Sequence, residues 1–180
     1  MKLAQLHTAG WQFGDIKTDN ILVGAYGQTE LVDYGGVTEH GHSVKQFTEM
    51  YDRGYWRCGA RIADETYDLF SFAVLCIQLI LPKNRAKEAF TVSPKQRNIG
   101  YLQQLLAEDK TLLPFHPFII AALEGRFGSG AEALQAWNLI RWKNHEQRIV
   151  TKSGSPFRFV QALFISIMLC VLTMMFVFQY

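Results

Sequence analysis

The sequence predicts a mainly α-helical domain that carries one small β-hairpin, followed by a single transmembrane helix at the C-terminus. Three observations predict this architecture. Two short runs rich in β-branched and apolar residues flank a glycine-containing turn, apolar residues then recur at helical spacing, and a twenty-residue stretch near the C-terminus carries no charge. With 180 residues, 49% of them hydrophobic, the chain can bury one good core, so we expect one domain plus an appendage.

Composition excludes several classes of protein. The net charge of +2 is too small to indicate a nucleic-acid-binding surface. The three cysteines, Cys58, Cys76 and Cys170, cannot all pair with one another and form no C-x-x-C motif, so we expect free thiols in a reducing compartment. The first ten residues lack the apolar run of a signal peptide, which argues against export.

The hairpin is predicted from residues 20–23 (NILV) and 29–32 (TELV), which Gly24 and Gly27 separate. From Thr66 onward apolar residues recur at three- and four-residue steps until Pro82, which predicts a largely buried helix over 66–81. We expect everything after the hairpin to be helical. Further helices are predicted around residues 102–107, 118–123 and 131–140, with Pro94, Pro114 and Pro117 in the connections.

The transmembrane helix is predicted over residues 159–178, which would span ~30 Å as an α-helix, the thickness of the hydrocarbon core. Arg148, Lys152 and Arg158 precede it, and the positive-inside rule then keeps the preceding domain in the cytoplasm. Residues 151–158 include a Gly/Ser-rich segment and are expected to be a juxtamembrane linker. The predicted protein is therefore a tail-anchored, single-pass membrane protein with a folded domain over residues 1–150.

Two motifs carry the chemistry. Residues 14–20 read GDIKTDN, and residues 33–35, across the hairpin, read DYG. The chain here resembles the protein kinase family, whose catalytic loop has the form D-x-K-x-x-N and whose metal-binding motif is D-F-G. Residues 67–72 (YDLFSF) are similar to the D-x-x-S-F segment of that family. The resemblance is specific over residues 6–81 and looser over 102–142, and it implies the helical C-terminal lobe (C-lobe) of a kinase, with both motifs on the hairpin.

The resemblance implies a role for each residue of the motifs. Asp15 would accept or orient the proton of the substrate hydroxyl, and Lys17 would place a positive charge near the transferred phosphoryl group. Asn20 and Asp33 would supply oxygen ligands to the Mg²⁺ that accompanies ATP. The lysine at position 17 is typical of serine/threonine kinases, and the chain is similar to the membrane-anchored kinases of the bacterial Hanks type found in spore-forming bacilli.

Two further residues would support these groups. Gly35 would let the chain turn sharply after the metal ligand. Asp68 would brace the catalytic loop from beneath. Each residue also has a simpler explanation as a turn residue or a solvated charge, and the joint order and spacing favour the kinase interpretation.

The sequence departs from the family at several positions. Phe13 and Gly14 stand where kinases have histidine and arginine, and the missing arginine removes the usual partner of a phosphorylated activation loop. Phe13 is still expected to fill an apolar slot. No A-P-E motif follows, and residues 51–60 replace it. Arg126 is the candidate for the arginine that normally pairs with the glutamate of that motif.

The sequence also contains no glycine-rich phosphate loop, strand lysine or partner glutamate, the elements with which the N-terminal lobe (N-lobe) of a kinase covers ATP. A dropped coding region, a genuine fragment and a lobe supplied by another chain all explain this. The expected partners are protein substrates, ATP and a membrane, with a possible dimer or N-lobe partner and no nucleic acid. The expected function is that of a serine/threonine protein kinase, in a truncated or fragmentary form. The alternatives are a non-catalytic, membrane-tethered pseudokinase-like module and a small-molecule phosphotransferase.

Overall fold

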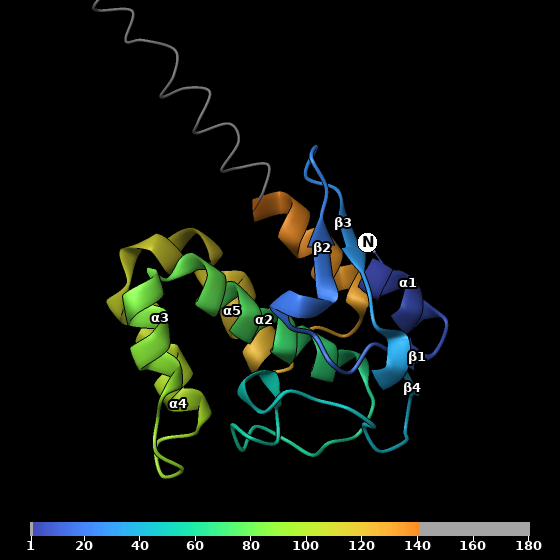
Figure 1. Ribbon diagram of the computed structural model, residues 1–180, viewed down its shortest axis with the longest axis horizontal. Helices are drawn as coiled ribbons and strands as arrows, with labels where there is room; N and C mark the ends of the chain where they lie inside the picture. The colour runs from blue at the N-terminus through green and yellow to red at the C-terminus, as the bar shows by residue number, and fades with distance from the viewer. Residues whose placement is uncertain (1, 141–180) are drawn as a thin grey trace, which may run out of the picture. The chain divides into compact units, whose positions relative to one another are not determined.

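The centre of the fold is the sixteen-residue helix α2, Glu65–Ile80 (Figure 1). The computed structural model describes residues 2–140. Asp64 begins α2 by accepting a hydrogen bond from the Tyr67 backbone N–H at 2.8 Å, and the helix ends where Leu81 takes an extended conformation before Pro82. The helix predicted over residues 66–81 is therefore confirmed.

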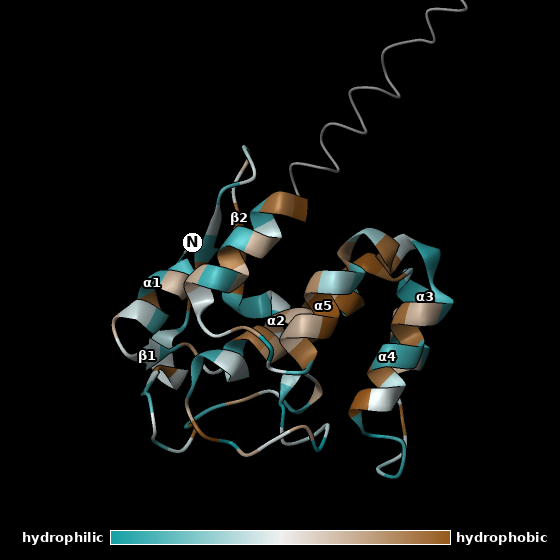
Figure 2. Cartoon of the chain, turned by 180° about the vertical axis from the view of Figure 1, so that it is seen from behind, coloured by the Kyte–Doolittle hydropathy of each residue, from teal (hydrophilic) through white to brown (hydrophobic). Residues whose placement is uncertain are grey.

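The core forms around α2 because this helix is buried on most of its sides. Helix α5, His116–Leu123, packs along it, and Figure 2 shows hydrophobic residues along α5 and the adjoining part of α2. Each large apolar side chain removed from water contributes about 1.5–3 kcal/mol to folding. The largest fully buried side chains include Trp56, Tyr67, Phe13, Phe70 and Ile16.

The remaining described helices are α1, Lys2–Thr8, α3, Lys83–Phe90, and α4, Ile99–Glu108, together with residues 130–140. The helices expected around residues 102–107, 118–123 and 131–140 are confirmed. Helix α1 was not predicted, and α3 was covered only by the general expectation of helix after the hairpin. Pro82 ends α2 but also caps α3, which begins at the next residue. Pro114 lies inside a 3-10 helix, Lys110–Phe115, and Pro117 lies in the first turn of α5, so these two prolines do not interrupt the helical path as expected.

The predicted hairpin is confirmed. Strands β2, Ile21–Val23, and β3, Thr29–Leu31, pair antiparallel with Ile21 opposite Leu31. A second antiparallel pair joins β1, Trp11–Gln12, to β4, Thr38–Glu39. This pair was not predicted, because two-residue strands are too short to show an alternating pattern.

The expectation that the chain is helical throughout after the hairpin is wrong for residues 40–64. This segment is irregular apart from a 3-10 helix, Glu49–Tyr51, and an isolated antiparallel bridge between Ser43 and Ile62. Turns and side chains together satisfy its backbone in place of a regular ladder. The buried Asp52 carboxylate accepts hydrogen bonds from the backbone N–H groups of Gly54 and Tyr55 and from the Tyr67 hydroxyl. Asp52 also forms an ion pair with Arg61.

Several predictions fall on residues outside those described: the domain end at residue 150, the linker over 151–158 and the transmembrane helix over 159–178. Within residues 2–140, none of the helices combines the length and the apolar character needed to span a membrane.

We predict that Asp64, the N-cap of α2, contributes more to the free energy of unfolding than an ordinary N-cap does. Asp64 accepts hydrogen bonds from Tyr67 N–H and from both terminal nitrogens of Arg53, whereas Asn98, the cap of α4, accepts one from Tyr101 N–H. Asp64→Ala should lower the free energy of unfolding by about 2 kcal/mol, and the control Asn98→Ala by about 1 kcal/mol, in urea titrations. Equal losses would contradict this.

The same residue predicts a pH dependence. Burial acts to raise the pKa of Asp64, but the hydrogen bonds from Arg53 and Thr66 and the Arg53 charge outweigh it and leave that pKa below its usual value of 3.8. A carboxyl whose pKa is lowered by folding contributes to the free energy of unfolding at pH values above its unfolded-state pKa. This contribution is lost as the pH falls through its folded-state pKa. The difference between wild type and Asp64→Ala should therefore shrink below about pH 4.

Candidate functional site

Asp15 lies at the centre of a buried polar cluster on the loop that follows β1. Its Oδ2 accepts a hydrogen bond from Lys17 Nζ at 2.6 Å and a longer one from Asn20 Nδ2 at 3.3 Å. Its Oδ1 accepts a hydrogen bond from Thr48 Oγ1 at 2.8 Å. Both carboxylate oxygens are therefore held in place, and Asp15 keeps only 7% of its surface exposed. Sequence reasoning missed Thr48, since no motif marks a threonine 33 residues along the chain.

Lys17 is a fixed positive charge among carboxylates. Its hydrogen bond to Asp15 raises its pKa above the usual value of 10.5; burial opposes this, and the charges of Asp15, Asp33 and Asp19 add to it. The lysine stays protonated at neutral pH because its pKa moves further from that range. The fold thus pairs Lys17 with Asp15 of the same motif, and the charge of Asp33 of the second motif acts on the same lysine.

Asn20 and Asp33 present oxygens of the kind that hard cations prefer. Asn20 is buried and donates from its amide nitrogen to the Asp15 carbonyl at 2.9 Å, which leaves the amide oxygen as its free acceptor. Asp33 is exposed, and one carboxylate oxygen accepts a hydrogen bond from Gly35 N–H at 3.3 Å. Among residues 2–140, three or more His, Cys, Asp or Glu side chains nowhere gather around one point that could hold a metal ion. A Mg²⁺ ion here would need oxygens from a nucleotide and water to complete its shell.

Asp68 holds the loop in position from α2. It is fully buried, and its carboxylate accepts hydrogen bonds from the backbone N–H groups of Phe13 at 2.7 Å and Gly14 at 2.9 Å. His7 Nε2 on α1 completes the arrangement at 3.0 Å from Asp68 Oδ2. His7 was not predicted, because it lies 61 residues from Asp68 in the sequence and belongs to no motif.

Glycines bring the backbones of the two motifs together. Gly14 has a φ of +88°, and a Cβ atom there would lie 2.8 Å from the carbonyl oxygen of Gly36. Phe13 is fully buried and packs edge to face against Tyr34 with ring centroids 5.7 Å apart, so the expectation that it fills an apolar slot is confirmed. The left-handed residue of the second motif is Asp33, with a φ of 60°, and not Gly35.

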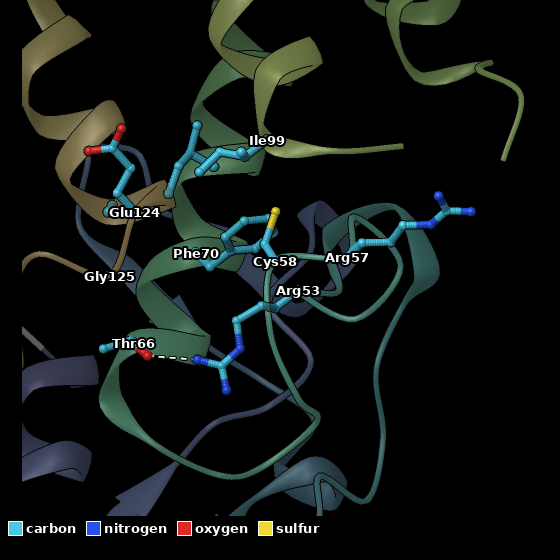
Figure 3. A pocket seen from close by; sticks show the side chains of 10 residues that line it. Arg53, Arg57, Cys58, Thr66, Phe70, Ile99, Glu124 and Gly125 are labelled. Atoms are coloured by element: carbon cyan, nitrogen blue, oxygen red, sulfur yellow. Dashed lines mark hydrogen bonds between the residues drawn. The ribbon is translucent and has the colours of Figure 1, made fainter. Parts of the chain in front are cut away.

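Arg126 is the candidate for the arginine that pairs with the A-P-E glutamate in kinases, a glutamate that this sequence lacks. Arg126 forms an ion pair with Glu124 at 2.7 Å. Glu124 lines a pocket of about 480 Å³ that residues of the segment 51–60 also line. In this pocket Arg53 donates a hydrogen bond to Thr66 at 2.7 Å (Figure 3). Cys58 also lines this pocket, and burial raises the pKa of its thiol to about 11, so it is a neutral thiol and a poor nucleophile at neutral pH.

The relatives of this chain are serine/threonine protein kinases. The chain is 37% identical over 131 residues to the serine/threonine-protein kinase YabT of Bacillus subtilis (strain 168), a match that covers 72% of the chain and 37% of YabT. It is 30% identical over 82 residues to the serine/threonine-protein kinase SMU1 of Mycosarcoma maydis, covering 43% of the chain and 11% of that protein. No protein-family model matches the chain.

These matches confirm the resemblance to protein kinases that the motifs indicate. The chain spans a little over a third of the length of YabT and about a tenth of that of SMU1. The mainly helical architecture with a small hairpin is consistent with the C-lobe of a kinase.

We predict that Gly14 tolerates no side chain. Gly14→Ala should lower the free energy of unfolding by about 3 kcal/mol, because it adds a clash with the Gly36 carbonyl to the cost of a left-handed backbone. The matched control is Gly27→Ala, whose φ of +77° is similar but whose Cβ would meet nothing within 4 Å. The control should lose only about 1 kcal/mol. Chemical denaturation measures both, and equal losses would show that the contact with Gly36 costs nothing.

Proposed function

We propose that this chain, a homologue of serine/threonine protein kinases, is the large lobe of such a kinase and takes part in transferring the γ-phosphoryl group of ATP to hydroxyl groups of protein substrates. The observation that carries the proposal is the cluster around Asp15, whose two carboxylate oxygens are held by Lys17, Asn20 and Thr48. A solvated surface carboxylate has no need of three side-chain donors.

Each residue has a task in this proposal. Asp15 orients the substrate hydroxyl and accepts its proton as the new O–P bond forms and the bond to the ADP leaving group breaks. The hydrogen bond that the Thr48 hydroxyl donates to Asp15 Oδ1 supports this role, because it means that a hydroxyl group can reach this carboxylate oxygen. Lys17 stabilises charge on the transferred group, and ATP with Mg²⁺ supplies the phosphoryl group and its neutralising cation.

Asn20 and Asp33 would hold that cation, each with one oxygen. The amide oxygen of Asn20 is the atom left free by its two donated hydrogen bonds, and the Asp33 carboxylate is exposed. In protein kinases an N-lobe covers the nucleotide. The proposal assigns that task to polypeptide outside these 180 residues.

We also propose that residues 159–178 anchor the domain to a membrane as a single tail anchor, with the N-terminal domain in the cytoplasm. The support is the uncharged twenty-residue stretch and the basic residues that precede it, Arg148, Lys152 and Arg158.

The phosphoryl-transfer proposal predicts Mg²⁺-dependent incorporation of γ-labelled phosphate into a generic protein substrate by the whole purified chain, assayed together with a polypeptide that supplies a kinase N-lobe. Asp15→Asn should reduce the rate at least about 100-fold because it removes the proton acceptor. Asp33→Asn should also abolish measurable incorporation, because it weakens the hold on the cation. The control is Glu30→Gln on the exposed face of the hairpin, which should leave the rate within about twofold.

Incorporation that survives Asp15→Asn would contradict the proposal. A folded chain that incorporates no phosphate would favour the second candidate, a tethered pseudokinase-like module, for which Gly14 in place of the arginine of the kinase motif is the supporting feature.

The anchor proposal predicts that the expressed chain stays with membranes after alkaline carbonate extraction and is released by detergent. A variant ending at residue 150 should appear in the soluble fraction, since it lacks the apolar stretch. Extraction of the whole chain by carbonate alone would contradict the anchor.

A further inference from the structure

A second pocket, of about 550 Å³, opens between the C-terminal end of α2 and helix α3. Its apolar wall includes Met50, Leu79 and Phe90, and Leu79 keeps 64% of its surface exposed. Its polar wall includes Lys83 and Lys87, and none of the residues that line it is acidic. The pocket therefore combines an apolar surface with positive charge.

The two lysines have no ion-pair partner in the part of the chain that the structure describes. Lys83 and Lys87 are exposed and lie one turn apart on α3, so their side chains are neighbours on the helix surface. Within residues 2–140 neither takes part in an ion pair, whereas Arg85, between them, pairs with Glu108 and Asp109. The pocket side of α3 thus keeps two positive charges that the fold does not compensate.

The pocket is connected to the cluster around Asp15 through a short segment of chain. The Thr48 hydroxyl donates a hydrogen bond to Asp15, and Met50 of the pocket wall lies two positions after Thr48 in the chain. Two residues span at most about 7 Å. The Tyr51 hydroxyl donates to Gln78 on the pocket wall. A polypeptide with a hydroxyl placed at Asp15 would have its neighbouring residues within reach of this pocket.

We propose that this pocket binds a segment of the protein substrate in which acidic side chains stand beside an apolar residue, and that Lys83 and Lys87 select this segment. The proposal rests on the proposed function for the identity of the occupant as a substrate. Charge complementarity carries it, because two uncompensated lysines attract carboxylates and repel basic segments, and Leu79 and Met50 provide an apolar surface for the neighbouring side chain.

The test measures binding and needs no phosphoryl transfer. Three labelled peptides each contain a serine and a leucine, and they differ only in whether the residues around these two are Glu, Gln or Lys. Their binding to the whole detergent-solubilised chain is measured by fluorescence anisotropy. We expect the Glu peptide to bind at least about tenfold more tightly than the Lys peptide, with a difference that shrinks as salt rises.

The variants are Lys83→Glu and Lys87→Glu, each of which creates an opposite-charge pair one turn apart and so keeps α3 stable. Each should weaken binding of the Glu peptide about threefold to tenfold, because an attraction becomes a repulsion. The charge-matched control is Lys2→Glu on α1, which lies at the opposite end of the described unit from α3 in Figures 1 and 2. It should change binding less than about twofold.

Equal binding of the three peptides would overturn the proposal. A preference for the Glu peptide that survives both Lys83→Glu and Lys87→Glu would also overturn it, as would a preference that Lys2→Glu reduces as much as these two variants do. The outcome is separate from that of the proposed function. If phosphate is incorporated but the Glu peptide is not preferred, only the pocket assignment is contradicted. If the Glu peptide is preferred through Lys83 and Lys87 but no phosphate is incorporated, the pocket remains a site for acidic segments and the phosphoryl-transfer proposal is contradicted.

Discussion

The rest of the site depends on the buried carboxylate of Asp68. A fully buried charge is costly unless donors surround it, and here two backbone N–H groups and the His7 ring provide them. These three contacts join α1, the loop that carries Asp15, and α2. Since α2 is also the centre of the hydrophobic core, the position of the loop is set by the best-packed part of the molecule. The loop is therefore rigid where Asp15 needs a defined direction.

The charged groups near Asp15 and those on α3 form two different surfaces. Around Asp15 the fold arranges carboxylates about one lysine, which suits a site that handles phosphate and a cation together. On α3 it leaves Lys83 and Lys87 without an ion-pair partner among residues 2–140. The chain from Thr48 to Tyr51 links these surfaces, because Thr48 contacts Asp15 and Tyr51 contacts Gln78. One short segment thus belongs to both the chemical site and the neighbouring pocket.

Much of the regular structure could be predicted because it leaves local patterns. The period of α2, the two runs of the hairpin and the apolar stretches of α4 and α5 all appear in the sequence and in the structure. Helix α3 was not predicted as a separate helix because its sequence, KNRAKEAF, is short and mostly polar. The irregular path of residues 40–64 was missed because backbone turns and the side chains of Asp52 and Arg53 make its hydrogen bonds in place of a regular ladder.

The sequence by itself determined the residue types of the site: the order and spacing of Asp15, Lys17, Asn20 and Asp33 are local properties of the chain. Only the tertiary structure decided which distant groups hold them. Thr48 reaches Asp15, and His7 reaches Asp68, across 33 and 61 residues of sequence. Such contacts leave no periodic signal, because they arise where the packing of α2 brings separate segments together and a buried carboxylate takes the donors it finds there.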